Sequence, residues 1–416
     1  MKLCMVSATY PDIHCGVGDF VGVLCPRLAQ EGIDVHVLTS RDPRVRPSEE
    51  NPRVHPTLEA WGWRQAPALI RAVQELRPDL VHIQYETLMY RRSPMIELFP
   101  LLLKRAGFRG PVIFSPHEFH GPHLFTSRGL RADLQAMNPR YLPTFVGRGE
   151  FLWELRCRAM VQQSDVVAVT NEPLLEHLRR EFPSRARRIV LTPLSSIVPD
   201  HSGGEDRGET RRRLGLAPGE VLLVYFGFLR PEKRVEMVLD AFSSLAHEAL
   251  PVRLLVIAGQ GGVGDSYESY RTSLRQRFAS LGADGRAHWY DYVPYDELAT
   301  LLQAADVAVL PIAGGVSWRR SSFLACLRHG LAVVTTRGEH TPPEVEDREH
   351  ALLVPPDDQE ALTGALRRVI ADGDLRHRLR AGAQTLYKRR DWNQVVKSNL
   401  ETYELALRTR GGKGTR

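Results

Sequence analysis

Two cationic side chains follow a short apolar run in the second half of the chain. Arg230 and Lys233 come after Val221–Phe226 and a tight turn at Gly227, and an amphipathic pattern begins near Val235. A helix N-terminus carries partial positive charge, and Arg and Lys add full charges beside it. This combination predicts a site for a diphosphate, with a charged surface turn as the alternative.

A second cationic cluster follows another apolar run. The segment SWRRSS at residues 317–322 comes after Val307–Leu310 and before the apolar stretch Phe323–Leu327. Adjacent arginines after a buried strand favour anion binding. Hydroxyl groups at the start of a helix can act only as caps, which is the alternative for the serines. The side chains that we expect to bind the same anionic ligand are Arg319, Arg320, Ser321 and Ser322.

Polar side chains also follow the strand-like runs of the first half. His117 comes after Val112–Ser115, where an imidazole could donate to a sugar hydroxyl or to developing charge on a reacting ring. A solvated loop histidine is the alternative. The other side chains at strand ends that could bind the hydroxyl groups of an acceptor substrate are Gln84, Glu86, Glu118 and Glu172.

Two glycine-bearing segments could bring the backbone close to a ligand. Gly16 and Gly18 could let backbone N–H groups approach a phosphate or sugar at the start of a helix, or could form an ordinary loop. As a dinucleotide motif this segment fails, because the third glycine of GxGxxG would fall at Val21. A nicotinamide-dependent oxidoreductase is therefore disfavoured. The segment Gly259–Gly262, which includes Gly261, is either a close-approach loop or a turn.

Short β-branched apolar runs alternate with longer amphipathic stretches along the whole chain, which predicts parallel sheets in two doubly wound, Rossmann-like α/β domains facing a central cleft. The predicted strands are Leu3–Ser7, Val35–Thr39, Leu80–Ile83, Val112–Ser115, Val166–Thr170, Val221–Phe226, Arg253–Ala258, Val307–Leu310 and Ala332–Thr335. The predicted helices are Phe20–Glu31, Pro67–Leu76, Val235–Ala246, Tyr267–Leu281, Asp296–Ala305, Gln359–Ile370 and Asn393–Leu407. Ligands of such sheets bind at the carboxyl ends of the strands, where the candidate residues lie.

A polar, Gly-rich segment at Pro199–Glu220 separates the two predicted domains. We expect an N-terminal domain at 1–199, a linker with a short helix at 200–220, and a C-terminal domain at 221–390. A final helix and basic tail at 391–416 could cross back to the first domain.

The composition is that of an ordinary globular protein. Of the 416 residues 43% are hydrophobic and 25% charged, and the net charge is +6. This mild excess does not indicate nucleic acid as a partner, but it allows an anionic ligand or peripheral contact with a membrane surface. Five scattered cysteines indicate a reducing compartment, so we expect the cytoplasm. Neither zinc-ligand spacing nor a Ser-His-Asp arrangement is present.

Several motifs, in this order, resemble one family over almost the whole chain. They are a Gly-bearing loop after the first strand, PDLVHIQYE, a strand ending in PHE, FGFLRPEKR, LLVIAGQGG, WYDYVPYDELATLLQAADVAVLP, HGLAVVTT and TPPEVEDREHALLVPPDD. The chain resembles the retaining, nucleotide-sugar-dependent glycosyltransferases of family 4 (glycosyltransferase group 1), which have the GT-B fold.

This resemblance implies an enzyme that transfers a sugar with retention of configuration and without a metal ion or other cofactor. The co-substrate would be a UDP- or GDP-linked sugar, bound mainly by the C-terminal domain. The acceptor, bound mainly by the N-terminal domain, would be a carbohydrate, a lipid-linked molecule or a small molecule.

The resemblance also assigns roles to single residues. Lys233 matches the diphosphate-binding lysine of the family, and His117 matches the histidine near the reacting sugar. Tyr292 and Val293 fall in the loop beside the donor base, and the loop with Gly16 and Gly18 approaches the phosphates. We therefore expect His117, Lys233 and Arg230 to be catalytic.

The sequence departs from the family pattern at three positions. The family usually has two glutamates eight positions apart, where this chain has Ser317 and Ala325. The arginine that often follows the turn glycine is replaced by Phe228, with Arg230 as the substitute. A non-catalytic protein that binds a sugar or nucleotide is therefore the alternative function.

Overall fold

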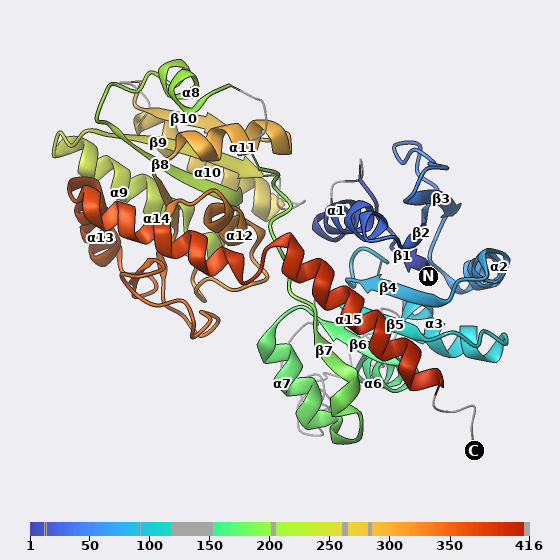
Figure 1. Cartoon of the computed structure of the whole chain (residues 1–416). Helices are drawn as coiled ribbons and strands as arrows, with labels where there is room; N and C mark the ends of the chain where they lie inside the picture. The colour runs from blue at the N-terminus through green and yellow to red at the C-terminus, as the bar shows by residue number, and fades with distance from the viewer. Residues whose placement is uncertain are drawn as a thin grey trace, which may run out of the picture. The chain divides into compact units, whose positions relative to one another are not determined.

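The chain forms two compact units in a computed structural model (Figure 1). Unit 1 contains Met1–Leu194 and Trp392–Arg416, and unit 2 contains Ser195–Asp391. The structure describes residues 1–11, 13, 15–91, 93–117, 153–200, 205–259, 265–281 and 285–411. Two of the predicted site residues, Glu118 and Gly261, lie outside these ranges.

Unit 1 is built on a parallel sheet in the order β3-β2-β1-β4-β5-β6-β7. Its strands are β1 (Lys2–Val6), β2 (Asp34–Ser40), β3 (Arg53–Leu58), β4 (Leu80–Tyr85), β5 (Val112–Pro116), β6 (Val166–Val169) and β7 (Ile189–Leu191). Its helices include α1 (Gly16–Gln30), α2 (Ala66–Leu76), α3 (Pro94–Arg105), α6 (Trp153–Gln163), α7 (Glu172–Glu181) and α15 (Trp392–Gly411), with short 3-10 turns at Trp63–Gln65 and Pro183–Arg188.

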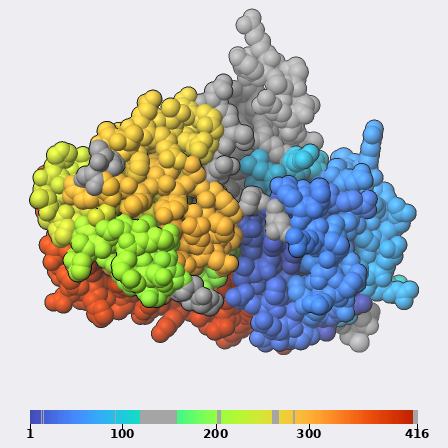
Figure 2. All heavy atoms as spheres, turned by 90° about the horizontal axis from the view of Figure 1, so that it is seen from above, coloured from blue at the N-terminus to red at the C-terminus, as the bar shows by residue number. Residues whose placement is uncertain are grey.

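Unit 2 repeats this architecture with the strand order β10-β9-β8-β11-β12-β13, again parallel. Its strands are β8 (Val221–Phe228), β9 (Val252–Gly259), β10 (Ala287–Tyr290), β11 (Val307–Leu310), β12 (Ala332–Thr336) and β13 (Leu352–Val354). Its helices include α8 (Arg207–Arg213), α9 (Val235–His247), α10 (Asp265–Leu281), α11 (Tyr295–Ala304), α12 (Ser321–Arg328), α13 (Gln359–Ala371) and α14 (Gly373–Lys388), with a 3-10 turn η5 (Pro231–Lys233). Green, yellow and orange segments form the visible surface of this unit in Figure 2, and blue segments form much of that of unit 1.

These sheets confirm the predicted fold class of two parallel-sheet, Rossmann-like α/β domains. All nine predicted strands are present, and each central strand is buried on both faces, as its continuous apolar run requires. The four strands that were not predicted are β3, β7, β10 and β13, which are the edge strands of the two sheets.

The segment predicted as a linker with a short helix contains helix α8 (Arg207–Arg213). Helix α8 belongs to unit 2, where Arg207 and Arg211 both form ion pairs with Asp306, at 2.5 and 2.8 Å. Arg211 also donates to the carbonyl of Ala304 at the end of α11. Residues 205–220 are therefore part of the second folded unit, because their arginines bind the carboxyl end of α11 and the residue after it.

Side-chain alternation divides the polar and apolar residues of the unit 1 sheet between its two faces. Val81, Ile83 and Tyr85 of β4 join a core with residues of α2, α3, α6 and α7. His82 and Gln84 therefore lie on the opposite face, where α1 and α15 pack (Figure 1).

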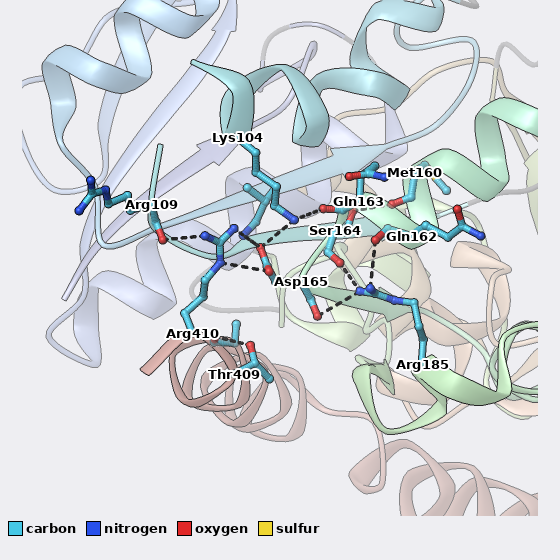
Figure 3. Close-up of polar contacts among 12 residues, drawn as sticks. Lys104, Arg109, Met160, Gln162, Gln163, Ser164, Asp165, Arg185, Thr409 and Arg410 are labelled. Atoms are coloured by element: carbon cyan, nitrogen blue, oxygen red, sulfur yellow. Dashed lines mark hydrogen bonds and ion pairs between the residues drawn. The ribbon is translucent and has the colours of Figure 1, made fainter. Parts of the chain in front are cut away.

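Helix α15 is held to unit 1 by a buried ion cluster at its carboxyl end (Figure 3). The carboxylate of Asp165 accepts from Arg410 Nε and Nη2 at 3.2 and 3.3 Å and from the Val112 N–H at 2.9 Å. Lys104 Nζ lies 3.5 Å from the same carboxylate. Burial raises the pKa of Asp165, but the hydrogen bonds from Arg410 and Val112 outweigh this effect and hold it below its usual value.

The same cluster caps the carboxyl end of α6. Lys104 donates to the carbonyl of Gln163, and Arg185 donates to those of Gln162 and Ser164. Cationic side chains at this position bind carbonyl groups that have no partner within the helix. Asp165 thus balances cations that also stabilise α6.

A second polar contact holds α15 at the level of the sheet. Tyr403 OH lies 3.0 Å from Nδ1 of His82, whose Nε2 lies 2.7 Å from Ser115 Oγ. Burial, together with the nearby charge of His117, lowers the pKa of His82 to about 3, so its ring is neutral in the folded protein.

We expect Asp165→Ala to destabilise unit 1 by about 1–3 kcal/mol, because it leaves the partly exposed cations Lys104 and Arg410 and the buried Val112 N–H without their carboxylate. Denaturant unfolding monitored by circular dichroism measures the change. Arg408→Ala is the matched control, since Arg408 is an exposed cation of the same helix that pairs with Glu404 at 3.0 Å. Equal, small losses in both variants would contradict a stabilising role for the cluster.

We expect acid to destabilise the protein partly through His82. Its pKa is about 3 in the folded state and near 6.5 when unfolded, so the unfolded chain binds an extra proton between these values. The contribution of neutral His82 to the free energy of unfolding is therefore fully present above pH 6.5 and is lost as the pH falls toward 3. In His82→Gln, the slope of unfolding free energy against pH should decrease by up to ~1.4 kcal/mol per pH unit. An unchanged slope between pH 4 and 6 would show that His82 does not contribute.

Candidate functional site

His117 lies directly after β5, at the carboxyl edge of the unit 1 sheet. Its Nε2 lies 2.7 Å from Gln84 Oε1, and its backbone N–H donates to the carbonyl of Tyr85. The ring of Phe20 in α1 packs edge-on against the imidazole, with centroids 5.4 Å apart. Trp392 stacks on Phe20, so α1 and α15 together fix the position of His117.

Gln84 contacts His117 from the neighbouring strand. Its side chain is only 1% exposed, and its amide nitrogen lies 3.1 Å from His82 Nε2 and 3.5 Å from Met5 Sδ. Side-chain alternation points residue 84 into the covered face of the sheet. Acceptor binding by Gln84 stays a prediction.

The carboxylate of Glu86 has a structural role in the turn after β4. It accepts the backbone N–H groups of Leu88 and Met89, at 3.0 and 2.8 Å. Glu172 begins α7, where Asn171 caps the helix by accepting from the Leu174 N–H. For both carboxylates, and for Glu118 outside the described ranges, acceptor binding stays a prediction.

Gly16 and Gly18 belong to the first turn of α1, although the sequence places them in a loop before it. The preceding residue, Cys15, does not cap the helix with its side chain. A Cβ atom at Gly18 would lie 2.7 Å from Thr9 Oγ1 and 3.0 Å from the Thr9 backbone, so only glycine fits there. Gly18 thus lets α1 pack against the segment after β1, and donor binding by both glycines stays a prediction.

In unit 2, Lys233 ends the short turn η5 and is buried, at 8% exposure. In the part of the chain that the structure describes, it forms no ion pair, and the carboxylate of neighbouring Glu232 lies 3.9 Å from Arg230. Arg234 instead pairs with Asp357 at 2.5 Å, which fixes the turn. Burial, assisted by the charge of Arg320, lowers the pKa of Lys233 to about 7. Lys233 is thus a buried lysine outside any ion pair among the described residues, and the nearby charge of Glu232 offsets the effect of burial only in part.

The loop before α12 and the turn after β8 lie close together. The carbonyl of Glu232 accepts from the Ala313 N–H at 3.0 Å. Gly227 has a φ of +153°, and a Cβ atom there would lie 3.3 Å from Tyr225 OH and 3.9 Å from Ser322 Oγ. The structure therefore brings Gly227, Lys233, Arg320 and Ser322 into one region of unit 2.

Helix α12 begins in this region without a side-chain cap. Its N-cap residue is Arg320, which has an extended backbone and forms no capping hydrogen bond. Ser321 is exposed and Ser322 is buried in the first turn, and Arg319 is exposed before it. Uncapped N–H groups beside two cations form an arrangement that binds anions.

A buried cluster anchors the loop that carries these residues. Trp318 donates from Nε1 to Glu344 at 2.8 Å, and the guanidinium of Arg390 lies 4.2 Å from the centroid of the Trp318 ring. Arg390 also lies 3.8 Å from Glu344. Because Trp318 is fixed from both sides, the next two residues, Arg319 and Arg320, start from a rigid position.

The remaining candidates lie at the ends of β8 and β10 and around α12. Phe228 and Tyr292 are 50% and 54% exposed, and Val293 is buried. The aromatic ring of Phe228 covers Gly259 of the neighbouring strand. Ser317 is half-buried in the loop, whereas Ala325 is fully buried within α12. The donor roles of Tyr292 and Val293 stay predictions.

Sequence reasoning missed the residues that support the site from distant segments. They are His82 and Tyr403 below His117, Phe20 and Trp392 beside it, and Arg234, Asp357, Glu344 and Arg390 in unit 2. The only local signal was the polar residue His82 inside an apolar strand.

Within the described ranges, His, Cys, Asp and Glu side chains form no group of three or more that could hold a metal ion. The helices described there also include none with the length and hydropathy to span a membrane.

Curated relatives share moderate sequence identity with the chain. The D-inositol 3-phosphate glycosyltransferase of Corynebacterium efficiens is 25% identical over 406 residues, which cover 91% of this chain and 89% of that protein. The protein of that name from Saccharomonospora viridis is 30% identical over 253 residues, or 60% of this chain and 57% of its own length.

Solved structures share the fold. Sucrose-phosphate synthase from Thermosynechococcus elongatus superimposes with a TM-score of 0.69 at 17% identity, over 97% of this chain and 98% of that one. Anabaena HepE in complex with UDP and glucose gives a TM-score of 0.67 at 15% identity, over 97% and 99% of the two chains.

Two family models match successive parts of the chain. "Glycosyltransferase Family 4" matches residues 15–194, and "Glycosyl transferases group 1" matches residues 206–386. Together these segments cover most of both units. The chain therefore belongs to the group 1 and family 4 glycosyltransferases of the GT-B fold.

Proposed function

We propose that the protein transfers a sugar from a nucleotide-diphosphate sugar to an acceptor hydroxyl, with retention of configuration. The observation that carries this proposal is the burial of Lys233, whose charge Glu232 compensates only in part. Burying a cation without a partner is costly, so such a residue is kept where a ligand supplies the opposite charge. A diphosphate is an anion of suitable charge for this region.

The cations of unit 2 supply the chemistry that the leaving group needs. As the bond between sugar and diphosphate breaks, negative charge grows on the phosphate oxygen. Lys233, Arg230 and the first turn of α12 stabilise that charge without a metal ion. The acceptor hydroxyl attacks on the face that the diphosphate leaves, and its proton passes to the departing phosphate oxygen.

The residues of unit 1 orient the reacting sugar and bind the acceptor. His117 orients the donor ring through a hydrogen bond, and its rigid surroundings support this role. Glu86, Glu118 and Glu172 bind acceptor hydroxyls. The acceptor is a carbohydrate, a lipid-linked molecule or a small molecule, and the protein works in the cytoplasm or at the inner face of a membrane.

The donor pocket differs from the usual pattern of the family. Alanine at position 325 cannot accept hydrogen bonds from a ribose, and it has no exposed surface. We propose that Arg319, Arg320, Ser321 and Ser322 bind the donor instead, with Tyr292 and Val293 beside its base. The base is uracil or guanine. The structure of HepE, a structural neighbour, was solved in complex with UDP and glucose.

The alternative of a non-catalytic binding protein is not favoured. The relatives that match the chain over most of its length are named as glycosyltransferases. The cations of the proposed diphosphate site are present, and their surroundings are ordered by Trp318, Glu344 and Arg390.

We expect Lys233→Met to lower the rate of sugar transfer by about 10²–10³-fold, the cost of removing one charge-stabilising group. The unliganded protein should keep or gain thermal stability, because the pKa of Lys233 is depressed and its protonation near pH 7 opposes folding. Lys388→Met, which changes an exposed lysine of α14, is the matched control. Full transfer activity in Lys233→Met would overturn the proposed role.

We expect nucleoside diphosphate affinity to fall as the pH rises above 7. The free protein loses the Lys233 proton near pH 7, while the bound anion favours the charged lysine and raises its pKa. The dissociation constants of UDP and GDP, measured calorimetrically from pH 7 to 9, should rise by up to about tenfold per pH unit. In Lys233→Met this dependence should disappear. An equal slope in both proteins would assign the effect to another group.

A further inference from the structure

A continuous hydrogen-bond relay runs from helix α15 to His117 inside unit 1. Tyr403 OH lies 3.0 Å from His82 Nδ1, and His82 Nε2 lies 3.1 Å from Gln84 Nε2. Gln84 Oε1 then lies 2.7 Å from His117 Nε2. All four side chains are less than one-tenth exposed, so water does not replace these contacts.

The amide of Gln84 sets the direction of the relay at His117. A carbonyl oxygen only accepts, so Oε1 requires a proton on Nε2 of His117. The amide nitrogen donates to His82 Nε2, and it also faces Met5 Sδ at 3.5 Å, a weak acceptor that suits an N–H group. In this orientation His82 Nε2 carries a lone pair.

The proton of His82 must then lie on Nδ1. The ring is neutral and has one N–H group, because burial lowers its pKa to about 3. Ser115 Oγ lies 2.7 Å from Nε2, and its hydroxyl can share that lone pair with the Gln84 amide. The Nδ1–H group of His82 therefore donates to Tyr403 OH. The hydroxyl of Tyr403 acts as the hydrogen-bond acceptor at the α15 end of the relay.

The opposite arrangement reverses every member of the relay. With the proton of His82 on Nε2, Gln84 must turn its carbonyl toward that nitrogen and its amide nitrogen toward His117. The imidazole of His117 would then accept at Nε2 and, when neutral, carry its proton on Nδ1. The amide would also lose its contact with Met5. The tautomer of His117 is thus coupled to the hydrogen bond of Tyr403.

We propose that Tyr403 is a positioning residue, which accepts the Nδ1–H of His82, holds the Gln84 carbonyl toward His117 and so keeps His117 protonated at Nε2. Helix α15 thereby completes the site of unit 1, although it follows unit 2 in sequence. The effect on catalysis rests on the proposed function, in which His117 orients the donor ring. The effect on the tautomer of His117 does not.

Tyr403→Phe tests the proposal, because it removes the acceptor and keeps the ring. Thr402→Val is the matched control: Thr402 is buried at the preceding position of α15, and its hydroxyl donates to the Ser398 carbonyl of the same helix. The tautomer of His117 is read from its two imidazole ¹⁵N chemical shifts in the full chain, with resonances assigned by their loss in His117→Gln.

We expect Nε2-protonated His117 in the wild type and in Thr402→Val, and a shift toward the Nδ1-protonated form in Tyr403→Phe. The kcat of sugar transfer should fall about tenfold in Tyr403→Phe with little change in the donor KM. An unchanged His117 tautomer in folded Tyr403→Phe would overturn the proposal. A changed tautomer with unchanged kcat would support the relay and contradict the catalytic role proposed for His117.

Gln84→Glu provides a second test that does not depend on activity. A carboxylate only accepts, so it should hold the proton on Nε2 of His117 whether or not Tyr403 is present. In the Gln84→Glu background, Tyr403→Phe should therefore leave the ¹⁵N shifts of His117 unchanged. A tautomer change of the same size as in the wild-type background would show that the effect does not pass through Gln84.

Discussion

The burial of charge without a carboxylate partner is the constraint on which the candidate site of unit 2 depends. In the turn after β8, Arg234 is neutralised by Asp357 and Arg230 lies near Glu232, while Lys233 is buried beside further positive charge. Such an arrangement is electrostatically incomplete in the free protein, since desolvation opposes the charged lysine. An anionic ligand completes it, so the cost in stability and the affinity for a diphosphate have the same physical origin.

In unit 1 the buried polar groups form hydrogen bonds with neutral side chains. His82 interrupts an apolar strand that is covered on both faces, so each of its ring nitrogens needs a partner within the protein. Tyr403 supplies one of these partners from α15, and Ser115 and Gln84 supply the other. Each side chain of the network can form its hydrogen bonds only if its neighbour is in the matching orientation. The network therefore fixes the positions of the protons as well as those of the side chains.

The sequence predicted those features that depend on neighbouring residues. All central strands were found, since strands buried on both faces are continuous apolar runs, whereas the edge strands β3 and β10 contain polar or aromatic residues and Pro56. Strand ends likewise located His117 and Lys233. The contact of Gln84 with His117 was not predicted, because it depends on which face of β4 is covered. Tyr403 lies 321 positions from His82, so only the folded chain shows their contact.

Helix α15 links these observations, because one face of it contacts unit 1 at three levels. Trp392 stacks on Phe20 beside His117 at the carboxyl edge of the sheet, and Tyr403 contacts His82 within it. Arg410 binds Asp165 next to the start of β6, at the opposite edge. The spacings of eleven and seven residues are close to whole numbers of helical turns, so a straight helix presents all three side chains to the same side. An aromatic contact at one end and an ion pair at the other therefore constrain the register of the helix, and this register determines whether Tyr403 reaches His82.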